Sequence, residues 1–92
     1  MVVADKILAV LGAFSIERPG MTLAELARAT ELPMSTVHRI ATQLTAWGAL
    51  ERDHRRRYVI GFRLWQLGTL SPHAYDQRAH VVPFLEQLFI ET

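Results

Sequence analysis

Residues 33–48 read PMSTVHRIATQLTAWG, and this stretch sets the fold into which the rest of the chain must fit. Pro33 suits the first position of a helix, where its missing N–H would have no partner. Gly48 suits the left-handed residue that ends a helix. The stretch therefore predicts a helix over residues 33–47. Its apolar face, at helical spacing, consists of Val37, Ile40, Ala41, Leu44 and Trp47.

The outer side of this predicted helix is polar and carries no acid. A solvated helix of this length would usually place Glu and Lys on its exposed face. Here no acidic residue lies between Pro33 and Leu50. Such a surface favours contact with a polyanion. Its polar residues are Ser35, Thr36, His38, Arg39, Thr42 and Gln43.

A first helix is predicted from Ala4 to Ser15, where apolar or small residues recur at helical spacing. Val3, Val10 and Ala13 lie on its other side, so two buried faces are expected. The turn residues 17–20 then end it.

A second, shorter helix is predicted to begin at a capping box, in which Thr22 and Glu25 satisfy each other's backbone N–H groups. It extends to about Ala29 and ends at the turn formed by residues 30–32. Its buried residues are expected to be Leu23, Leu26 and Ala27.

Two short strands are predicted after the helix over residues 33–47, at residues 50–52 and 58–60. They flank the basic turn Asp53-His54-Arg55-Arg56-Arg57. The order of helix, capped short helix, turn, helix and basic hairpin is that of a winged helix-turn-helix, a mainly α fold with a small β-hairpin.

Two further helices are expected towards the C-terminus. One covers residues 62–67 and ends at Gly68, and both Trp65 and Trp47 are expected in the core or at an interface because they lie on apolar stripes. Ser71 and Pro72 start a linker. A last helix then runs from about Asp76 to the end, with a kink or break near Val82 caused by Pro83.

The charges of the chain are concentrated in its middle. Residues 32–63 contain six arginines against two acidic residues, whereas the segments on either side are net negative. We therefore expect one face of the protein to bind a polyanion. In the winged-helix interpretation the helix over 33–47 enters the major groove, where Arg39 suits the edge of a guanine. Arg55, Arg56 and Arg57 then reach the backbone or a minor groove.

Composition excludes several other classes of protein. The 92 residues form one core, with no cysteine for a disulfide or thiolate site and no apolar run long enough to cross a membrane, so a cytoplasmic protein without cofactor is expected. No phosphate-binding glycine loop, nucleophile elbow or carboxylate pair suggests an enzyme. The histidines lack the spacing of metal ligands. They are His38, His54, His73 and His80.

The chain resembles the N-terminal DNA-binding domain of the IclR family of bacterial regulators. The resemblance covers the whole chain. It rests on Leu26-Ala27, Leu32-Pro33, Ser35-Thr36-Val37-His38-Arg39, Gly48, Leu50-Glu51-Arg52-Asp53, Arg57-Tyr58, Ile60-Gly61, Leu64 and Leu67-Gly68.

The resemblance implies a winged helix-turn-helix over residues 1–70 that binds operator DNA as a homodimer. Residues 71–92 would be a linker helix leading to an effector-binding domain absent from this chain, which would take the small-molecule effector. Two departures stand out: Glu31 occupies a turn position where the family usually has Gly, and residues 53–57 replace a less basic Asp-Pro-Glu-Gly-Arg turn.

Dimerisation is also predicted from apolar surface alone. One small core cannot bury both the second face of the first helix and the apolar side of the last helix, so pairing through both is expected. The last helix contributes Val81, Val82, Phe84, Leu85, Leu88, Phe89 and Ile90.

Several alternatives remain for the individual residues and for the domain. Arg39 could contact phosphate only, Ser35 and Thr36 could cap their own helix, His38 could be solvated, and the arginine triplet could serve solubility. For the whole domain the alternative is a winged-helix protein–protein interaction module.

Overall fold

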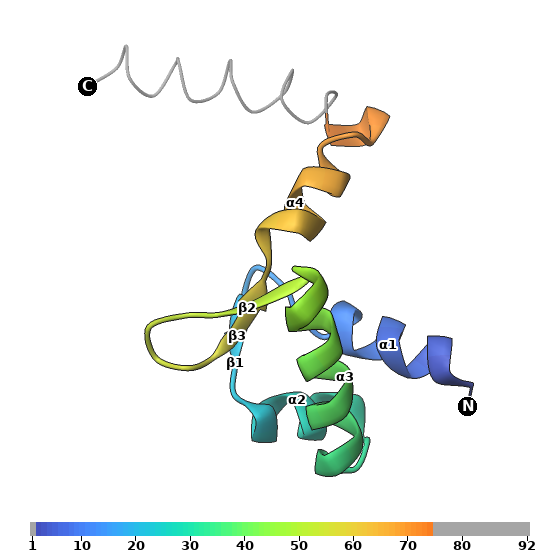
Figure 1. The fold of residues 1–92 in the computed structure, drawn as a ribbon, viewed down its shortest axis with the longest axis vertical. Coiled ribbons are helices and arrows are strands. Elements are labelled where there is room, and N and C mark those ends of the chain that lie inside the picture. The colour runs from blue at the N-terminus through green and yellow to red at the C-terminus, as the bar shows by residue number, and fades with distance from the viewer. Residues whose placement is uncertain (1, 75–92) are drawn as a thin grey trace.

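The computed structural model describes residues 2–74, and Figure 1 shows a compact body from which one helix projects. The predicted last helix, its Pro83 kink, its apolar residues and His80 lie outside the described residues. The elements, in order, are α1 (Val3–Gly12), β1 (Gly20–Met21), α2 (Leu23–Thr30), α3 (Met34–Trp47), β2 (Leu50–Arg52), β3 (Tyr58–Ile60) and α4 (Phe62–Gly68).

The capping signals in the sequence are confirmed at two helix ends. The Thr22 hydroxyl accepts the Glu25 N–H at 3.2 Å, and the Glu25 carboxylate accepts the Thr22 N–H at 3.1 Å, which starts α2. Gly48 ends α3 with φ of 97°. Pro33, however, precedes the first helical residue instead of occupying it, because its ψ of 143° is extended.

The sheet contains one strand more than predicted. β1 pairs antiparallel with β3, which pairs with β2, giving the order β1-β3-β2. β1 has only two residues, which is too few to show the alternation of apolar and polar side chains that marks a strand. The sequence therefore indicated only a turn near Gly20. α1 also ends earlier than predicted, at Gly12 instead of Ser15.

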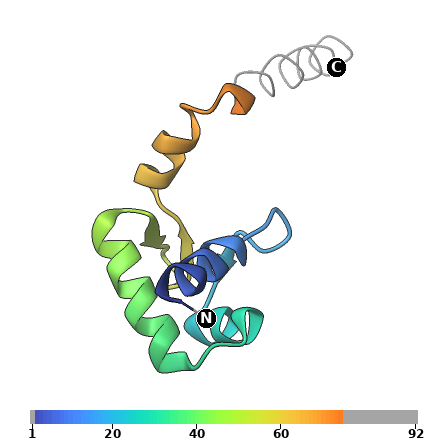
Figure 2. The ribbon, with the colours of Figure 1, turned by 90° about the vertical axis from the view of Figure 1, so that its right-hand side faces the viewer.

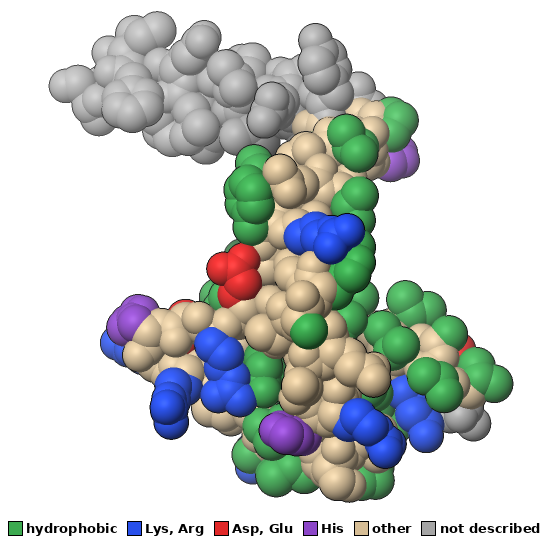
Figure 3. Space-filling view, in the orientation of Figure 1, with side chains coloured by type: hydrophobic (Ala, Val, Ile, Leu, Met, Phe, Trp, Pro, Cys, Tyr) green, Lys and Arg blue, Asp and Glu red, His purple; other side chains and the backbone are tan. Residues whose placement is uncertain are grey.

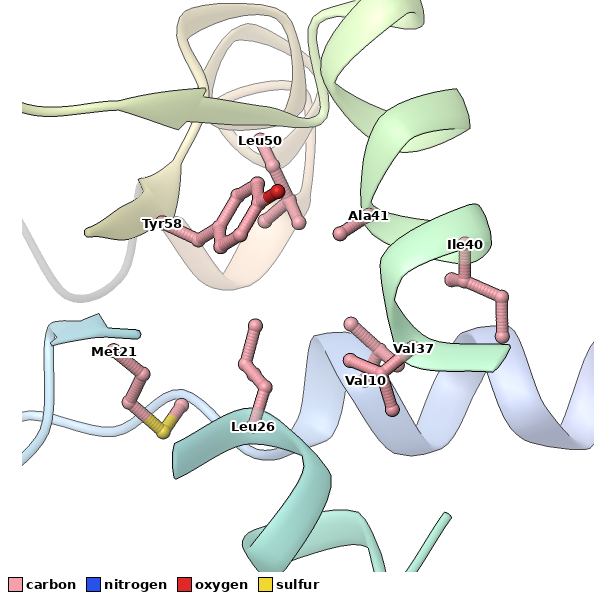
Figure 4. Packing of buried hydrophobic residues seen from close by; sticks show 8 residues of the cluster. All are labelled: Val10, Met21, Leu26, Val37, Ile40, Ala41, Leu50 and Tyr58. Atoms are coloured by element: carbon pink, nitrogen blue, oxygen red, sulfur yellow. The ribbon is translucent and has the colours of Figure 1, made fainter. Parts of the chain in front are cut away.

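The core lies where α1, α2, α3 and the sheet meet, as Figure 4 shows. Val10 is fully buried beside Val37, so the prediction that Val10 lies on a second face available to a partner is wrong. α1 packs against α2 and α3 through the side that carries Val10. Leu8, one of the apolar residues that recur at helical spacing between Ala4 and Ser15, is exposed, as is Val3. The buried cluster comprises Val10, Met21, Leu26, Val37, Ile40, Ala41, Leu50 and Tyr58.

α4 extends away from this body, as both ribbon views show (Figures 1 and 2). None of its seven residues is buried. Trp65 is 56% exposed and Trp47, on the last turn of α3, is 42% exposed. Neither tryptophan therefore belongs to the core.

Candidate nucleic-acid interface

The polar side of α3 faces away from the core, as its sequence predicts. Ser35, His38, Arg39, Thr42 and Gln43 are exposed, and Thr36 is half-buried. Figure 3 shows basic side chains spread over this region and the β2–β3 hairpin, with few acidic ones among them. α3 and the hairpin therefore present one face of predominantly positive charge.

The start of α3 leaves backbone donors available. Pro33 stands at the cap position and offers no side chain that could accept a hydrogen bond from the first turn. Free N–H groups at a helix start attract anions, and phosphate in particular. Ser35 and Thr36 are the second and third residues of α3, so the predicted contact residues lie beside these amides.

Thr42 is more constrained than its sequence position suggests. Its hydroxyl donates to the carbonyl oxygen of His38 at 2.8 Å. In this rotamer the hydroxyl proton is used within the helix, and the oxygen presents only lone pairs outward. Thr42 can therefore accept a hydrogen bond from a base but has no proton for a phosphate.

The hairpin turn is organised by Asp53. Its Oδ1 accepts the N–H groups of Arg55 and Arg57 at 2.8 and 2.9 Å, and its Oδ2 accepts from Nε of Arg57 at 3.2 Å. The backbone N–H of Arg57 is the main reason why the pKa of the Asp53 carboxyl lies below its ordinary value. Arg57, predicted as part of the DNA-contacting triplet, thus also forms an ion pair inside the hairpin.

Arg52 joins the two strands of the hairpin from the side. Its guanidinium lies 4.2 Å from the centre of the Tyr58 ring, and Nη2 donates to the Tyr58 hydroxyl at 2.6 Å. Nη1 donates to the Arg56 carbonyl oxygen at 3.3 Å. This role was missed from the sequence, although the pairing of residues 52 and 58 across a short hairpin is its signal.

The four arginines of the hairpin thus divide into two pairs. Arg52 and Arg57 make contacts that hold the hairpin together. Arg55 and Arg56 are exposed, and within residues 2–74 their guanidinium groups form no hydrogen bond or ion pair. Arg55 and Arg56 are therefore the arginines available to a ligand.

Other kinds of site gain no support from residues 2–74. No three His, Asp or Glu side chains in this range are grouped so that they could hold a metal ion. Within the same part of the chain, no helix is both long and apolar enough to cross a membrane.

The chain is similar to known proteins in sequence and in fold. The profile of the IclR helix-turn-helix domain matches residues 3–54. The HTH-type transcriptional regulator KipR of Bacillus subtilis is 34% identical over 83 residues, which are 90% of this chain and 33% of that protein. The chain thus spans about a third of the length of this relative.

Two solved structures are similar in fold along most or all of the chain. An IclR homolog from Microbacterium sp. strain HM58-2 has a TM-score of 0.76 and 27% identity, covering 100% of this chain and 39% of that one. An IclR homolog from Microbacterium hydrocarbonoxydans, complexed with 4-hydroxybenzoate, has a TM-score of 0.78 and 29% identity, covering 94% and 36%.

Proposed function

The chain belongs to the IclR helix-turn-helix family and is a DNA-binding domain of a transcriptional regulator, and we propose that it reads operator DNA with α3 in the major groove and the hairpin 53–57 against the backbone or a minor groove. The observation that carries this proposal is the acid-free outer side of α3 beside two exposed hairpin arginines. The major groove, about 12 Å wide, admits one helix.

Within α3 we assign different roles to different residues. Ser35 and Thr36, next to the free amides of the first turn, contact phosphate. Arg39 lies one turn further along and donates two hydrogen bonds to a guanine edge. His38 and Gln43 make the flanking contacts with bases or backbone, and Thr42 accepts a hydrogen bond from a base.

The hairpin supplies charge contacts that do not depend on sequence. Arg55 and Arg56 have unused guanidinium groups and neutralise phosphates or enter a minor groove. Arg57 adds its charge at the base of the turn while it remains paired with Asp53.

We propose that two copies bind a palindromic operator as a homodimer. α4 has no buried residue, and a stretch of apolar side chains along it faces solvent. Small domains rarely leave such a patch uncovered, and a two-fold pair buries it twice. The exposed α1 residues Val3 and Leu8 add to the apolar surface, whereas Val10 does not. The α4 residues are Phe62, Trp65, Leu67 and the adjoining Leu70.

For the intact regulator we propose that residues 1–70 form the DNA-binding unit and that residues 71–92 lead towards a domain that binds a small-molecule effector. The IclR homolog complexed with 4-hydroxybenzoate supports an effector of this size class. Such a regulator acts on DNA in the cytoplasm and needs no catalytic group of its own.

A salt titration with random-sequence duplex tests the proposal. Fluorescence anisotropy should give saturable binding at low salt, and affinity should fall steeply as salt rises because the bound arginines release counterions from the phosphates. Replacing Arg55 and Arg56 by Ala should lower the slope of log affinity against log salt by about one unit for each phosphate that is no longer neutralised.

Arg18→Ala is the matched control, because it removes one exposed arginine from the α1–β1 loop, which projects away from α3 (Figure 2). The slope for this variant should equal that of the parent. Absence of duplex binding at low salt would refute the proposal and favour a protein-interaction module, in which the hairpin binds an acidic protein.

A further inference from the structure

α3 and α4 are connected by a joint. It consists of residues 47–49 and 61–63 together with Glu51. The Arg63 guanidinium lies 4.1 Å from the centre of the Trp47 ring. Nη1 of Arg63 also donates to the Trp47 carbonyl oxygen at 3.2 Å, at the C-terminal end of α3. One side chain of α4 therefore holds both the ring and the backbone of the last residue of α3.

Beneath this contact the two backbones touch. The Gly61 N–H donates to the Ala49 carbonyl oxygen at 2.8 Å. A Cβ at Gly61 would overlap the carbonyl oxygen of Gly48, so position 61 has no space for a side chain. Arg63 itself packs over Gly48, at 3.0 Å from where a Cβ of that residue would lie.

The joint has a pivot and a brace. The pivot is the Gly61–Ala49 contact together with Glu51, whose carboxylate accepts the N–H of Phe62 at the start of α4. A helix attached only at its first residue is free to swing. The contact between Arg63 and Trp47 lies beside the pivot and restrains this swing. Further along α4, Trp65, Gln66 and Leu67 are separated from Trp47 by a cleft of about 490 Å³.

We infer that Arg63 is a positioning residue that fixes the direction of α4 relative to the recognition helix α3. This inference rests on the proposed function, in which two copies pair through α4. In such a pair the direction of α4 sets the separation of the two recognition helices. Half-sites in such operators lie about 10–10.5 base pairs apart or at multiples of that distance. Arg63 thereby selects the spacing of the half-sites without contacting DNA.

Spin-label distances test the joint without DNA. The sequence contains no cysteine, and Gly12 and Gly68 are positions where an added Cβ meets open space. Gly12→Cys and Gly68→Cys therefore place labels at the end of α1 and on α4. Double electron–electron resonance, with labelled chains diluted into unlabelled ones, should give one narrow distance distribution in the parent.

Arg63→Met and Trp47→Leu should each broaden this distribution, since both remove the contact between cation and ring. Arg63→Lys should restore most of the narrow distribution because it keeps a cation over the ring. Arg18→Met, which removes an exposed arginine that makes no contact in the joint, should change nothing. A distribution that Arg63→Met leaves narrow and unshifted would overturn the inference.

The second measurement uses an operator selected from random duplex with the full chain. Inserting one base pair between its half-sites should weaken binding by the parent about tenfold, and by Arg63→Met only about threefold or less. Affinity for a single half-site should be the same for both. If the inserted base pair weakened binding by the parent and by Arg63→Met equally, the inference would be overturned. If the parent bound no duplex at all, the proposed function would be refuted, and the spin-label distances would decide whether Arg63 fixes the direction of α4.

Discussion

Glu31 and Arg56 are the non-glycine residues within 2–74 that adopt positive φ, at 57° and 63°. A left-handed conformation costs an L-residue with a Cβ roughly 1–2 kcal/mol. Glu31 ends α2 and sets the tight turn into α3, and Arg56 forms the corner of the hairpin tip. Glu31, at the turn position where the family usually has Gly, therefore has a strained backbone, and Arg56 shares this strain.

Glu31→Gly should raise the free energy of unfolding by about 1 kcal/mol, because glycine adopts positive φ without the clash of a Cβ but loses more backbone entropy. Urea unfolding followed by circular dichroism measures the change. Glu31→Ala is the control, since it removes the charge but keeps the Cβ and should bring no gain. Equal stabilisation by both would show that charge, and not conformation, is responsible.

Arg39→Ala should weaken operator binding by about 1–3 kcal/mol and relax base preference at one or two positions, if Arg39 reads a guanine edge. Competition of the selected operator against single-base variants of it provides the measurement. Arg39 is exposed on α3, so the variant should unfold at the same temperature as the parent. An equal loss on operator and random duplex would make Arg39 a phosphate contact.

At the scale of the element, the hairpin shows what sequence could and could not predict. Its two strands lie at residues 50–52 and 58–60 as predicted, because the basic turn between them marks them locally. The division of its arginines was not predictable. By composition, Arg52 and Arg57 are equivalent to the other arginines of the hairpin. Only the placement of Tyr58 and Asp53 reveals that Arg52 and Arg57 are engaged in contacts within the hairpin.

The hairpin should respond to acid. Asp53 has a lowered pKa in the folded protein, chiefly through the Arg57 N–H, so it contributes stability above its ordinary pKa and loses it as pH falls through the folded value. Glu25, whose pKa is lowered by the Thr22 N–H, acts in the same direction. The melting temperature should therefore be level near neutral pH and fall below about pH 4.

Asp53→Asn tests how much the hairpin contributes to this loss of stability in acid. The variant should melt at a lower temperature than the parent at neutral pH and should show a smaller drop between about pH 5 and pH 3, because one titrating group is gone. Calorimetry across this range gives both values. Parallel curves for parent and variant would show that Asp53 is not coupled to folding.

At the scale of the whole molecule, Val10 shows where periodicity reaches its limit. The pattern correctly indicated apolar residues on more than one side of α1, but a pattern cannot say which side meets α3 and which meets solvent. Packing assigned Val10 to the core and left Leu8 and Val3 outside. Trp47 is the converse case, since its helical spacing is that of a core residue but no core lies beneath it.

Self-association should depend on α4 and not on exposed apolar residues in general. Trp65→Glu should make the chain monomeric at micromolar concentration without loss of helical signal, because Trp65 is already 56% exposed. Ile16→Glu is the matched control on the α1–β1 loop, where Ile16 is 95% exposed, and should leave association unchanged. Sedimentation velocity distinguishes the cases, and a parent that is monomeric throughout this range would contradict the prediction.

The start of α3, where Pro33 offers no acceptor, places thermostability and ligand affinity in competition. A hydroxyl or carboxylate at that position would typically stabilise a helix by about 1 kcal/mol by accepting the first N–H groups. The same oxygen would occupy the volume that a phosphate needs, and a carboxylate would also repel it. Consensus engineering that improves every helix end would thus improve this one at the expense of DNA binding.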